Sequence, residues 1–121
     1  KKLLVIDDDP RNIFALCAVL RAKGYPCRSA TSAVEGLSIL EQDDEIGIVL
    51  MDMMMPELDG YETMTRIRSM QGFSKLPIIA VTAKAMAGDR EKCIEAGAWD
   101  YLSKPVDTVH LLAALRSWLH R

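Results

Sequence analysis

The sequence predicts a doubly wound α/β domain, in which helices cover both faces of a five-stranded parallel sheet. Strand-like and helix-like segments alternate along all 121 residues, a length that fits one domain. The central strand-like runs are apolar at successive positions, which is typical of strands buried on both faces. A chain of this size buries roughly two thirds of its surface on folding, enough for one sizeable core.

Turn and capping residues bound the first three elements. A strand is expected at residues 3–6, followed by Asp9 as an N-cap. Pro10 then opens a helix that runs to about residue 23 and is closed by the glycine after it. Residues 26–30 are expected to form an edge strand, since proline is tolerated there.

The remaining elements alternate in the same way. Ser32 and Glu35 have the spacing of a capping box, and glycines and prolines separate the later apolar runs. The expected elements are a helix opened at 32–35, strands at 48–51, 78–81 and 98–102, helices at 58–70 and 86–96, and a final amphipathic helix from 107.

Composition and charge exclude several classes of protein. The formal charge of −2 gives no basic footprint of the kind that nucleic-acid binding requires. Cys17, Cys27 and Cys93 are odd in number and widely spaced, so neither a disulfide framework nor a Cys-x-x-Cys zinc site is expected. No apolar run approaches the ~18 residues that span a bilayer. We therefore expect a cytoplasmic domain that neither inserts into membranes nor binds nucleic acid by itself.

Polar residues follow four of the predicted strands at the carboxyl ends, where ligands of parallel sheets bind. Asp7 and Asp8 follow the first strand, and Asp52 closes the third. Thr82 follows the fourth strand and Lys104 the fifth. A single aspartate at a strand end can be a turn former or a cap. The combination of these five residues instead favours one shared site.

If the first and third strands are neighbours, their aspartates repel one another unless a cation or a proton neutralises them. Two unit charges ~4 Å apart interact by about 4 kcal/mol at an effective dielectric constant near 20. Carboxylate oxygens suit Mg²⁺, which completes its coordination with water and phosphate oxygens. Taken singly, Thr82 and Lys104 have structural explanations, as a strand-end hydroxyl and a solvated lysine. Together with a metal they make a site for phosphoryl transfer onto Asp52.

These motifs resemble, over the whole chain, the receiver domain of the response-regulator family, including the receiver part of hybrid histidine kinases. The family pattern is carried by Asp7-Asp8, by Asp52 with Met55-Pro56 and Asp59-Gly60, by Thr82-Ala83, and by Tyr101 with Lys104-Pro105. The resemblance implies a flavodoxin-like sheet with strand order 2-1-3-4-5. That order makes the first and third strands neighbours, which would bring Asp7 and Asp8 beside Asp52.

The resemblance also implies a role for each residue of the site. Asp52 would be the phosphoacceptor and take a phosphoryl group from the phosphohistidine of a histidine kinase or a histidine phosphotransfer protein. Asp8, Asp52 and the backbone carbonyl of Met54 would bind Mg²⁺, or Mn²⁺, directly, and Asp7 would bind it through water. Lys104 would pair with the phosphoryl group.

A second set of residues would carry the response. Thr82 would hydrogen-bond the phosphoryl group and draw Tyr101 inward, with a phosphorylation-dependent dimer formed through the fourth helix, the fifth strand and the fifth helix. Lys104-Pro105 is expected to be a cis peptide. The domain would catalyse only its own phosphorylation and dephosphorylation. The residues expected to tune the lifetime of the acyl phosphate are Met54, Ala83 and Lys84.

Rival functions lack their motifs. A haloacid-dehalogenase-type phosphatase needs a second carboxylate two residues after the nucleophile, where this chain has Met54. P-loop nucleotidases need GxxxxGK[ST] and dinucleotide enzymes need GxGxxG after a strand, and neither motif is present. The triple aspartate after the first strand would repel the phosphate of a flavin. The alternative that stays open is a binding module that never turns over.

The first helix carries a predicted docking site for a helical, histidine-bearing partner. Helical periodicity predicts a core face made of Leu16, Val19 and Leu20. Phe14 and Cys17 then fall on the solvated face with the arginines, and Ile13 lies at the border of the core face. We expect Ile13, Phe14 and Cys17 to form a small apolar patch beside the acidic site, which a partner helix would bury.

Overall fold

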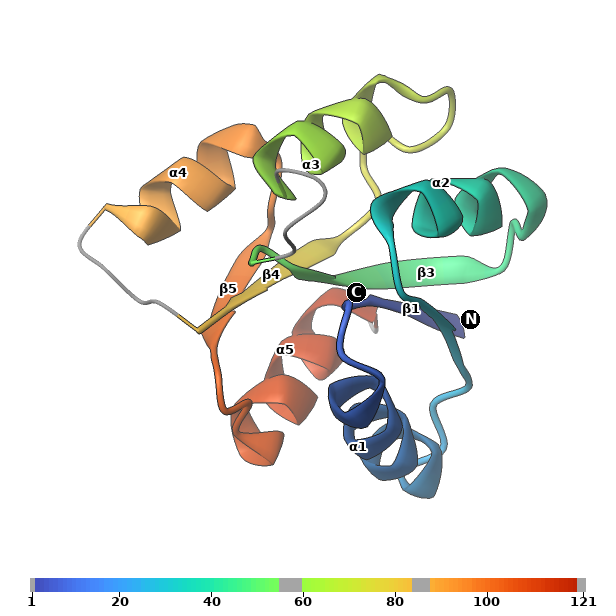
Figure 1. The fold of residues 1–121 in the computed structure, drawn as a ribbon, viewed down its shortest axis with the longest axis vertical. Coiled ribbons are helices and arrows are strands. Elements are labelled where there is room, and N and C mark those ends of the chain that lie inside the picture. Colours follow the sequence, from blue (N-terminus) through green and yellow to red (C-terminus); the bar gives the residue numbers. More distant parts are fainter. Residues whose placement is uncertain (1, 55–59, 84–87, 120–121) are drawn as a thin grey trace.

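The computed structural model describes residues 2–54, 60–83 and 88–119, the last by its backbone alone, and it forms a parallel sheet covered by helices (Figure 1). The elements are β1 (Lys2–Ile6), α1 (Pro10–Ala22), β2 (Cys27–Ala30), α2 (Ala33–Gln42), β3 (Ile46–Asp52), α3 (Gly60–Ser69), β4 (Ile78–Thr82), α4 (Asp89–Ala96), β5 (Asp100–Ser103) and α5 (Thr108–Leu119). The strand order is β2-β1-β3-β4-β5, all parallel. The expected fold class and strand order are confirmed. Among the described residues, no helix is long and apolar enough to cross a bilayer.

Side chains alternate along the central strands and build one hydrophobic layer on each side of the sheet. Leu4 and Ile6 of β1 belong to the layer under α2, α3 and α4, whereas Leu3 and Val5 belong to the layer under α1 and α5 (Figure 1). All residues of β3 and β4 are buried. The sequences of these two strands are nearly continuous apolar runs because helices cover both faces of the sheet.

Local capping groups set two helix starts as predicted. Asp9 Oδ1 accepts a 2.9 Å hydrogen bond from the backbone N–H of Arg11 at the start of α1. Ser32 Oγ accepts from the Glu35 N–H at 3.1 Å at the start of α2. The Glu35 carboxylate departs from the capping-box pattern, because it accepts from the N–H of Thr31 instead of that of Ser32.

Several element boundaries differ from the predicted ones. β3 extends to Asp52, so the carboxylate belongs to the last residue of the strand. α4 as described begins at Asp89, directly after Gly88, whose φ of 90° is outside the helical range. β5 begins at Asp100, two residues late, because the chain leaves α4 through Gly97, which has a φ of 123°. The predicted starts of α3 and α4, at residues 58 and 86, lie outside the described residues.

The predicted division of α1 into faces is only partly right: Leu20 is buried as predicted, but Cys17, predicted on the solvated face, is buried too. The residues of α1 that are buried against the core are Ile13, Cys17 and Leu20. Leu16 and Val19 are half-buried and line a cleft toward the segment after β5. Periodicity alone failed because α1 is apolar over more than half of its circumference, and only packing decides which edge of that stripe meets the sheet. Of the three predicted docking residues, Phe14 alone lies at the surface, with 78 % exposed.

Arg68 of α3 connects three segments. Its guanidinium donates hydrogen bonds to the carbonyl oxygens of Phe73, Leu76 and Gly97. It also lies over the ring of Trp99, 6.0 Å from the ring centroid. Burial lowers the pKa of Arg68 from its ordinary value. The end of α3, the turn before β4 and the end of α4 are therefore joined by one half-buried cation.

Candidate functional site

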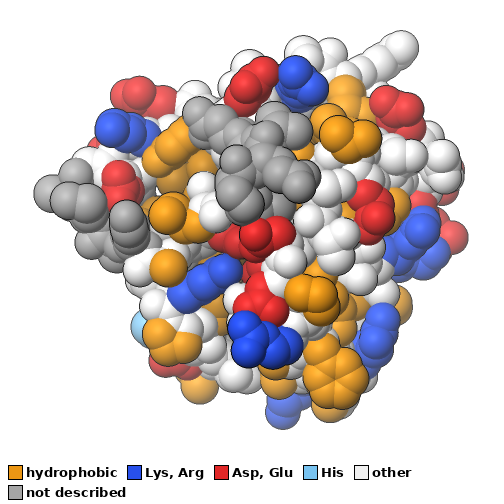
Figure 2. Space-filling view, viewed as in Figure 1, with side chains coloured by type: hydrophobic (Ala, Val, Ile, Leu, Met, Phe, Trp, Pro, Cys, Tyr) orange, Lys and Arg blue, Asp and Glu red, His pale blue; other side chains and the backbone are white. Residues whose placement is uncertain are grey.

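Three carboxylates meet at the carboxyl ends of β1 and β3. The pairing of Ile6 with Met51 across these strands places the residues that follow side by side. Carboxylate oxygens of Asp7, Asp8 and Asp52 all lie within 4.8 Å of one another. Asp7 and Asp52 are buried, each 3 % exposed, whereas Asp8 is exposed. Acidic side chains accordingly gather near the middle of the face in Figure 2, with basic side chains beside them.

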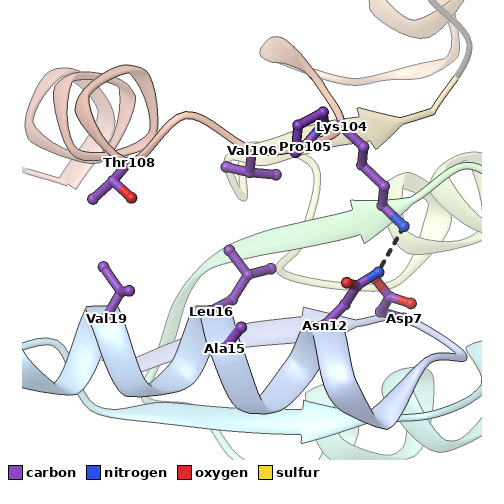
Figure 3. Close-up of a pocket in the computed structure, with 9 residues that line it drawn as sticks. All are labelled: Asp7, Asn12, Ala15, Leu16, Val19, Lys104, Pro105, Val106 and Thr108. Carbon is purple, nitrogen blue, oxygen red and sulfur yellow. Dashed lines mark hydrogen bonds and ion pairs between the residues drawn. The ribbon is translucent and has the colours of Figure 1, made fainter.

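Lys104 joins the two buried carboxylates from the end of β5. Its Nζ lies 3.2 Å from Asp7 Oδ2, shown in Figure 3, and 3.3 Å from Asp52 Oδ2. The other oxygen of each carboxylate accepts a 2.9 Å hydrogen bond from a backbone N–H, Asp7 from Asp9 and Asp52 from Met54. Both carboxylates are thus held in fixed orientations.

The backbone around Lys104 has the predicted form. The Lys104 N–H donates to the carbonyl of Thr82 at 2.7 Å, which ties the end of β5 to the end of β4. The Lys104-Pro105 peptide bond is cis, as expected. Thr82 itself is the last residue of β4 and is 4 % exposed.

The negative charge of Asp52 is unfavourable in the folded protein, and its pKa is raised. Burial raises the pKa of Asp52, Asp7 raises it further, and the Met54 N–H and Lys104 offset only part of this. Partial burial on its own would lower the pKa of Lys104, but the attraction of Asp52 and Asp7 outweighs it, and the pKa is raised. The site therefore has room for more positive charge than Lys104 supplies.

A hard divalent cation fits this donor set. The three carboxylates offer oxygens in one small volume, and exposed Asp8 leaves a side open to water and to a phosphoryl group. The carbonyl of Met54 follows Asp52 by two residues and stays a predicted ligand. Coulomb attraction at a buried, partly uncompensated carboxylate pair favours such a cation.

A second cavity, of about 220 Å³, holds the two predicted switch residues. Thr82 and Tyr101 line it together with Met54 and with Asp89 and Cys93 from α4. Burial raises the pKa of the Tyr101 hydroxyl, and the nearby Asp89 and Cys93 add to this. Residues of the neighbouring strands β4 and β5 thus line one cavity.

The residues predicted to tune the acyl phosphate are only partly described. Met54 is 44 % exposed directly after β3, and Ala83 is exposed directly after β4. Lys84 lies outside the described residues, as do Met55-Pro56 and Asp59 of the family pattern.

A family model, the response regulator receiver domain, matches residues 3–116. The chain belongs to this family. The sensor histidine kinase RcsC of Salmonella typhi is 40 % identical over 119 residues, which cover 98 % of this chain and 12 % of the kinase. The response regulator PleD of Caulobacter vibrioides is 34 % identical over 116 residues, 96 % of this chain and 25 % of that protein. The receiver domain thus spans 12 % of the length of the one relative and 25 % of the other.

A solved structure closely matches the receiver domain. The receiver domain of sensor histidine kinase PA1611 from Pseudomonas aeruginosa, with a magnesium ion coordinated in its active-site cleft, superposes with a TM-score of 0.90 at 35 % identity. The match covers 100 % of this chain and 98 % of that one. The carboxylate cluster of this chain lies in the same fold.

Sequence reasoning missed several residues of the site. Asn12 of α1 lines a cleft together with Asp7 and Lys104. Asp89 and Cys93 line the cavity of the switch residues. None of these residues stands at a strand end, and each lies on a helix whose orientation toward the strand ends is not stated by the sequence. With the strand order known, a helical-wheel plot of α1 and α4 would show which residues face the carboxyl ends of the strands, and could have identified these three.

Proposed function

We propose that this receiver domain accepts a phosphoryl group on Asp52 from the phosphohistidine of a histidine kinase or a histidine phosphotransfer protein, in a reaction that needs Mg²⁺ or Mn²⁺. The observation that carries the proposal is the position of the Lys104 ammonium, 3.3 Å from Asp52 Oδ2 within the carboxylate cluster. A cation fixed beside an oriented carboxylate is what phosphoryl transfer onto that carboxylate requires.

The metal would be held by Asp8, Asp52 and the Met54 carbonyl, with Asp7 reaching it through water. When bound, it neutralises and orients the phosphoryl oxygens. A carboxylate oxygen of Asp52 attacks phosphorus, and the bond to the histidine nitrogen breaks. Lys104, already between Asp7 and Asp52, pairs with a phosphoryl oxygen as negative charge arrives there.

The acyl phosphate would then be hydrolysed by the domain itself. Water must reach phosphorus past the exposed side chains of Met54 and Ala83. Together with Lys84, whose structure is not described, these residues would tune the lifetime of the phosphorylated state. The domain is accordingly proposed to catalyse only its own phosphorylation and dephosphorylation.

The response would pass through Thr82 and Tyr101. A phosphoryl oxygen offers an acceptor to the Thr82 hydroxyl, and Tyr101 can fill the part of the shared cavity that the hydroxyl leaves. The surface of α4, β5 and α5 changes shape as a result and would form a phosphorylation-dependent dimer. Ile94 of α4 and Val109 of α5, 42 % and 72 % exposed, provide apolar contacts for such an interface.

The phosphohistidine partner would dock on α1. Phe14, 78 % exposed, stays the proposed apolar contact, whereas Ile13 and Cys17 are core residues and take no part. The similarity to part of a sensor histidine kinase supports a place for this receiver domain within a hybrid kinase. A helical histidine-bearing domain is then the partner expected to cover α1.

Labelling with a small phosphodonor tests the function. With Mg²⁺ and acetyl phosphate, wild-type protein should acquire one hydroxylamine-sensitive phosphate at Asp52, and Asp52→Asn should acquire none. Asp44→Asn, which removes an exposed aspartate remote from β3's end, is the matched control and should be labelled normally. Labelling that survives in Asp52→Asn, or wild-type protein that is never labelled, would overturn the assignment, and the latter would favour a binding module.

A further inference from the structure

A cleft of about 260 Å³ lies beside the carboxylates, between α1 and the residues that follow β5 (Figure 3). One end is polar and is formed by Asp7, Asn12 and Lys104. Apolar side chains, including Leu16 and Pro105, form most of the walls, and Thr108 lines the cleft away from the polar end (Figure 3). The cleft is large enough to admit a planar aromatic ring, and it opens next to the group that reacts.

Asn12 is the residue of this cleft that the phosphoryl chemistry does not use. It lies in the first turn of α1, which Pro10 opens and the Asp9 side chain caps, so its position is fixed by local structure. Figure 3 shows its carboxamide at the same end of the cleft as the Asp7 carboxylate and the Lys104 ammonium. No hydrogen bond joins this carboxamide to any other residue within the described parts of the chain. A half-buried carboxamide with free donor and acceptor positions is available to a ligand.

The other polar groups at that end are already engaged. Asp7 Oδ1 accepts from the Asp9 N–H, and Asp7 Oδ2 accepts from Lys104. The Lys104 ammonium carries donors but no acceptor. The Asn12 carbonyl oxygen is therefore the uncharged acceptor that faces an incoming group at the polar end of the cleft.

We propose that the Asn12 carboxamide recognises the imidazole ring of the phosphohistidine donor, with the apolar walls of the cleft against the ring. This inference rests on the proposed function of Asp52. An Asp52 oxygen forms a bond to phosphorus while the bond from phosphorus to the ring nitrogen breaks, and the bonding electron pair stays on that nitrogen. The ring leaves as neutral imidazole when its other nitrogen already carries a proton. Asn12 Oδ1 accepts a hydrogen bond from that second N–H and so favours the protonated ring, which is the better leaving group.

Two small donors separate recognition of the ring from phosphorylation in general. Monophosphoimidazole carries the imidazole ring, whereas acetyl phosphate does not, and neither needs the partner protein. Initial rates of Asp52 labelling are measured with Mg²⁺ for wild type, Asn12→Ala and Asn12→Asp. Asn12→Ala should lower the rate with monophosphoimidazole by about five- to tenfold, the size expected for one lost hydrogen bond, and leave the acetyl phosphate rate within about twofold. Asn12→Asp keeps the acceptor and should retain the monophosphoimidazole rate.

The control is Arg11→Ala, which changes the neighbouring residue of the same turn on the solvent side and should alter neither rate. Equal rates for wild type and Asn12→Ala with monophosphoimidazole overturn the inference. An equal fall with both donors also overturns it, because a merely structural role of Asn12 would not distinguish the donors. If Asn12→Ala does not fold, a fall in the monophosphoimidazole rate of Asn12→Asp that exceeds its fall with acetyl phosphate overturns the inference as well. Wild-type protein labelled by neither donor overturns the proposed function itself, a result distinct from the other outcomes.

Discussion

The Lys104 ammonium lies 3.3 Å from Asp52 Oδ2, so a cation from the end of β5 meets the carboxylate that closes β3. Burial nevertheless raises the pKa of Asp52, and Lys104 offsets only part of this effect. The fold therefore holds a carboxylate that is less stable as an anion than it would be in the unfolded chain. The proposed function of Asp52 and the stability of the fold are therefore opposed at this residue.

Asp52→Asn should raise the free energy of unfolding at pH 7 without metal, by about 1 kcal/mol or roughly 3 to 5 °C in Tm. An acid whose folded pKa is raised contributes stability at low pH that is lost as the pH rises through that pKa. The gain should therefore shrink toward about pH 3, where wild-type Asp52 is protonated too. Urea unfolding at both pH values measures it, with Asp44→Asn as the charge-matched control. A destabilised Asp52→Asn at pH 7 would contradict the inferred electrostatics.

Lys104→Met should destabilise the fold at pH 7 by about 3 kcal/mol, since it leaves two buried carboxylates without their cation. The raised pKa of Lys104 means that its contribution is complete below about pH 10 and is lost at higher pH. Adding Mg²⁺ should restore part of the loss, because the metal supplies the missing charge. Lys75→Met, at an exposed position, is the control and should change little. Unchanged stability in Lys104→Met would mean that the ion pairs do not contribute.

Mg²⁺ should stabilise the wild-type protein against heat. At ten times the dissociation constant the gain is about 1.4 kcal/mol, by mass action on the folded state. Asp8→Asn should abolish this gain yet leave the metal-free Tm unchanged, because Asp8 is exposed. Thermal melts against MgCl₂, with NaCl at equal ionic strength, measure both effects. A Tm rise that persists in Asp8→Asn would place the metal elsewhere.

Arg68→Met should lower the free energy of unfolding by about 2 to 3 kcal/mol, since hydrogen bonds from a charged donor to three carbonyls are lost. Arg66→Met is the matched control from the same helix. Its ion pair with Glu62 is exposed on both sides, so the expected change is below about 0.5 kcal/mol. Chemical denaturation compares the two variants directly. Equal effects would show that burial of Arg68 does not matter.

Phe14→Asp should slow phosphotransfer from the phosphohistidine protein and leave labelling by acetyl phosphate unchanged. The exposed ring lies in the second turn of the helix that begins after Asp9, so a charge there would meet the partner and not the reacting atoms. Val34→Asp, at a residue of α2 that is 67 % exposed, is the control. The test is the rate of phosphoryl transfer from a phosphorylated histidine protein to wild type and to each of the two variants. A loss with both donors, or with neither, would count against docking on α1.

Most residues of the candidate site were predictable from the sequence. Asp7, Asp8, Asp52, Thr82 and Lys104 are polar residues that end or follow apolar strands, and parallel strands bring their carboxyl ends to one edge. The alternation of strand-like and helix-like hydrophobic patterns predicted the fold class, because each pattern depends only on residues that are close together in the sequence. The strand order came only through the family resemblance, because alternation alone does not state which strands pair.

The packing of α1 and the contacts of Arg68 and Asn12 were decided by the tertiary structure. Arg68 binds the carbonyl of Gly97, 29 residues away, and Lys104 reaches Asp7 across 97 residues. The apolar stripe of α1 is wide enough to pack at either edge, and the sheet selected the row of Ile13, Cys17 and Leu20. Local sequence patterns predict whether a segment is a helix or a strand and which polar groups stand at its ends. Which face turns inward, and which distant group it meets, is set by the competition of all side chains for one close-packed interior.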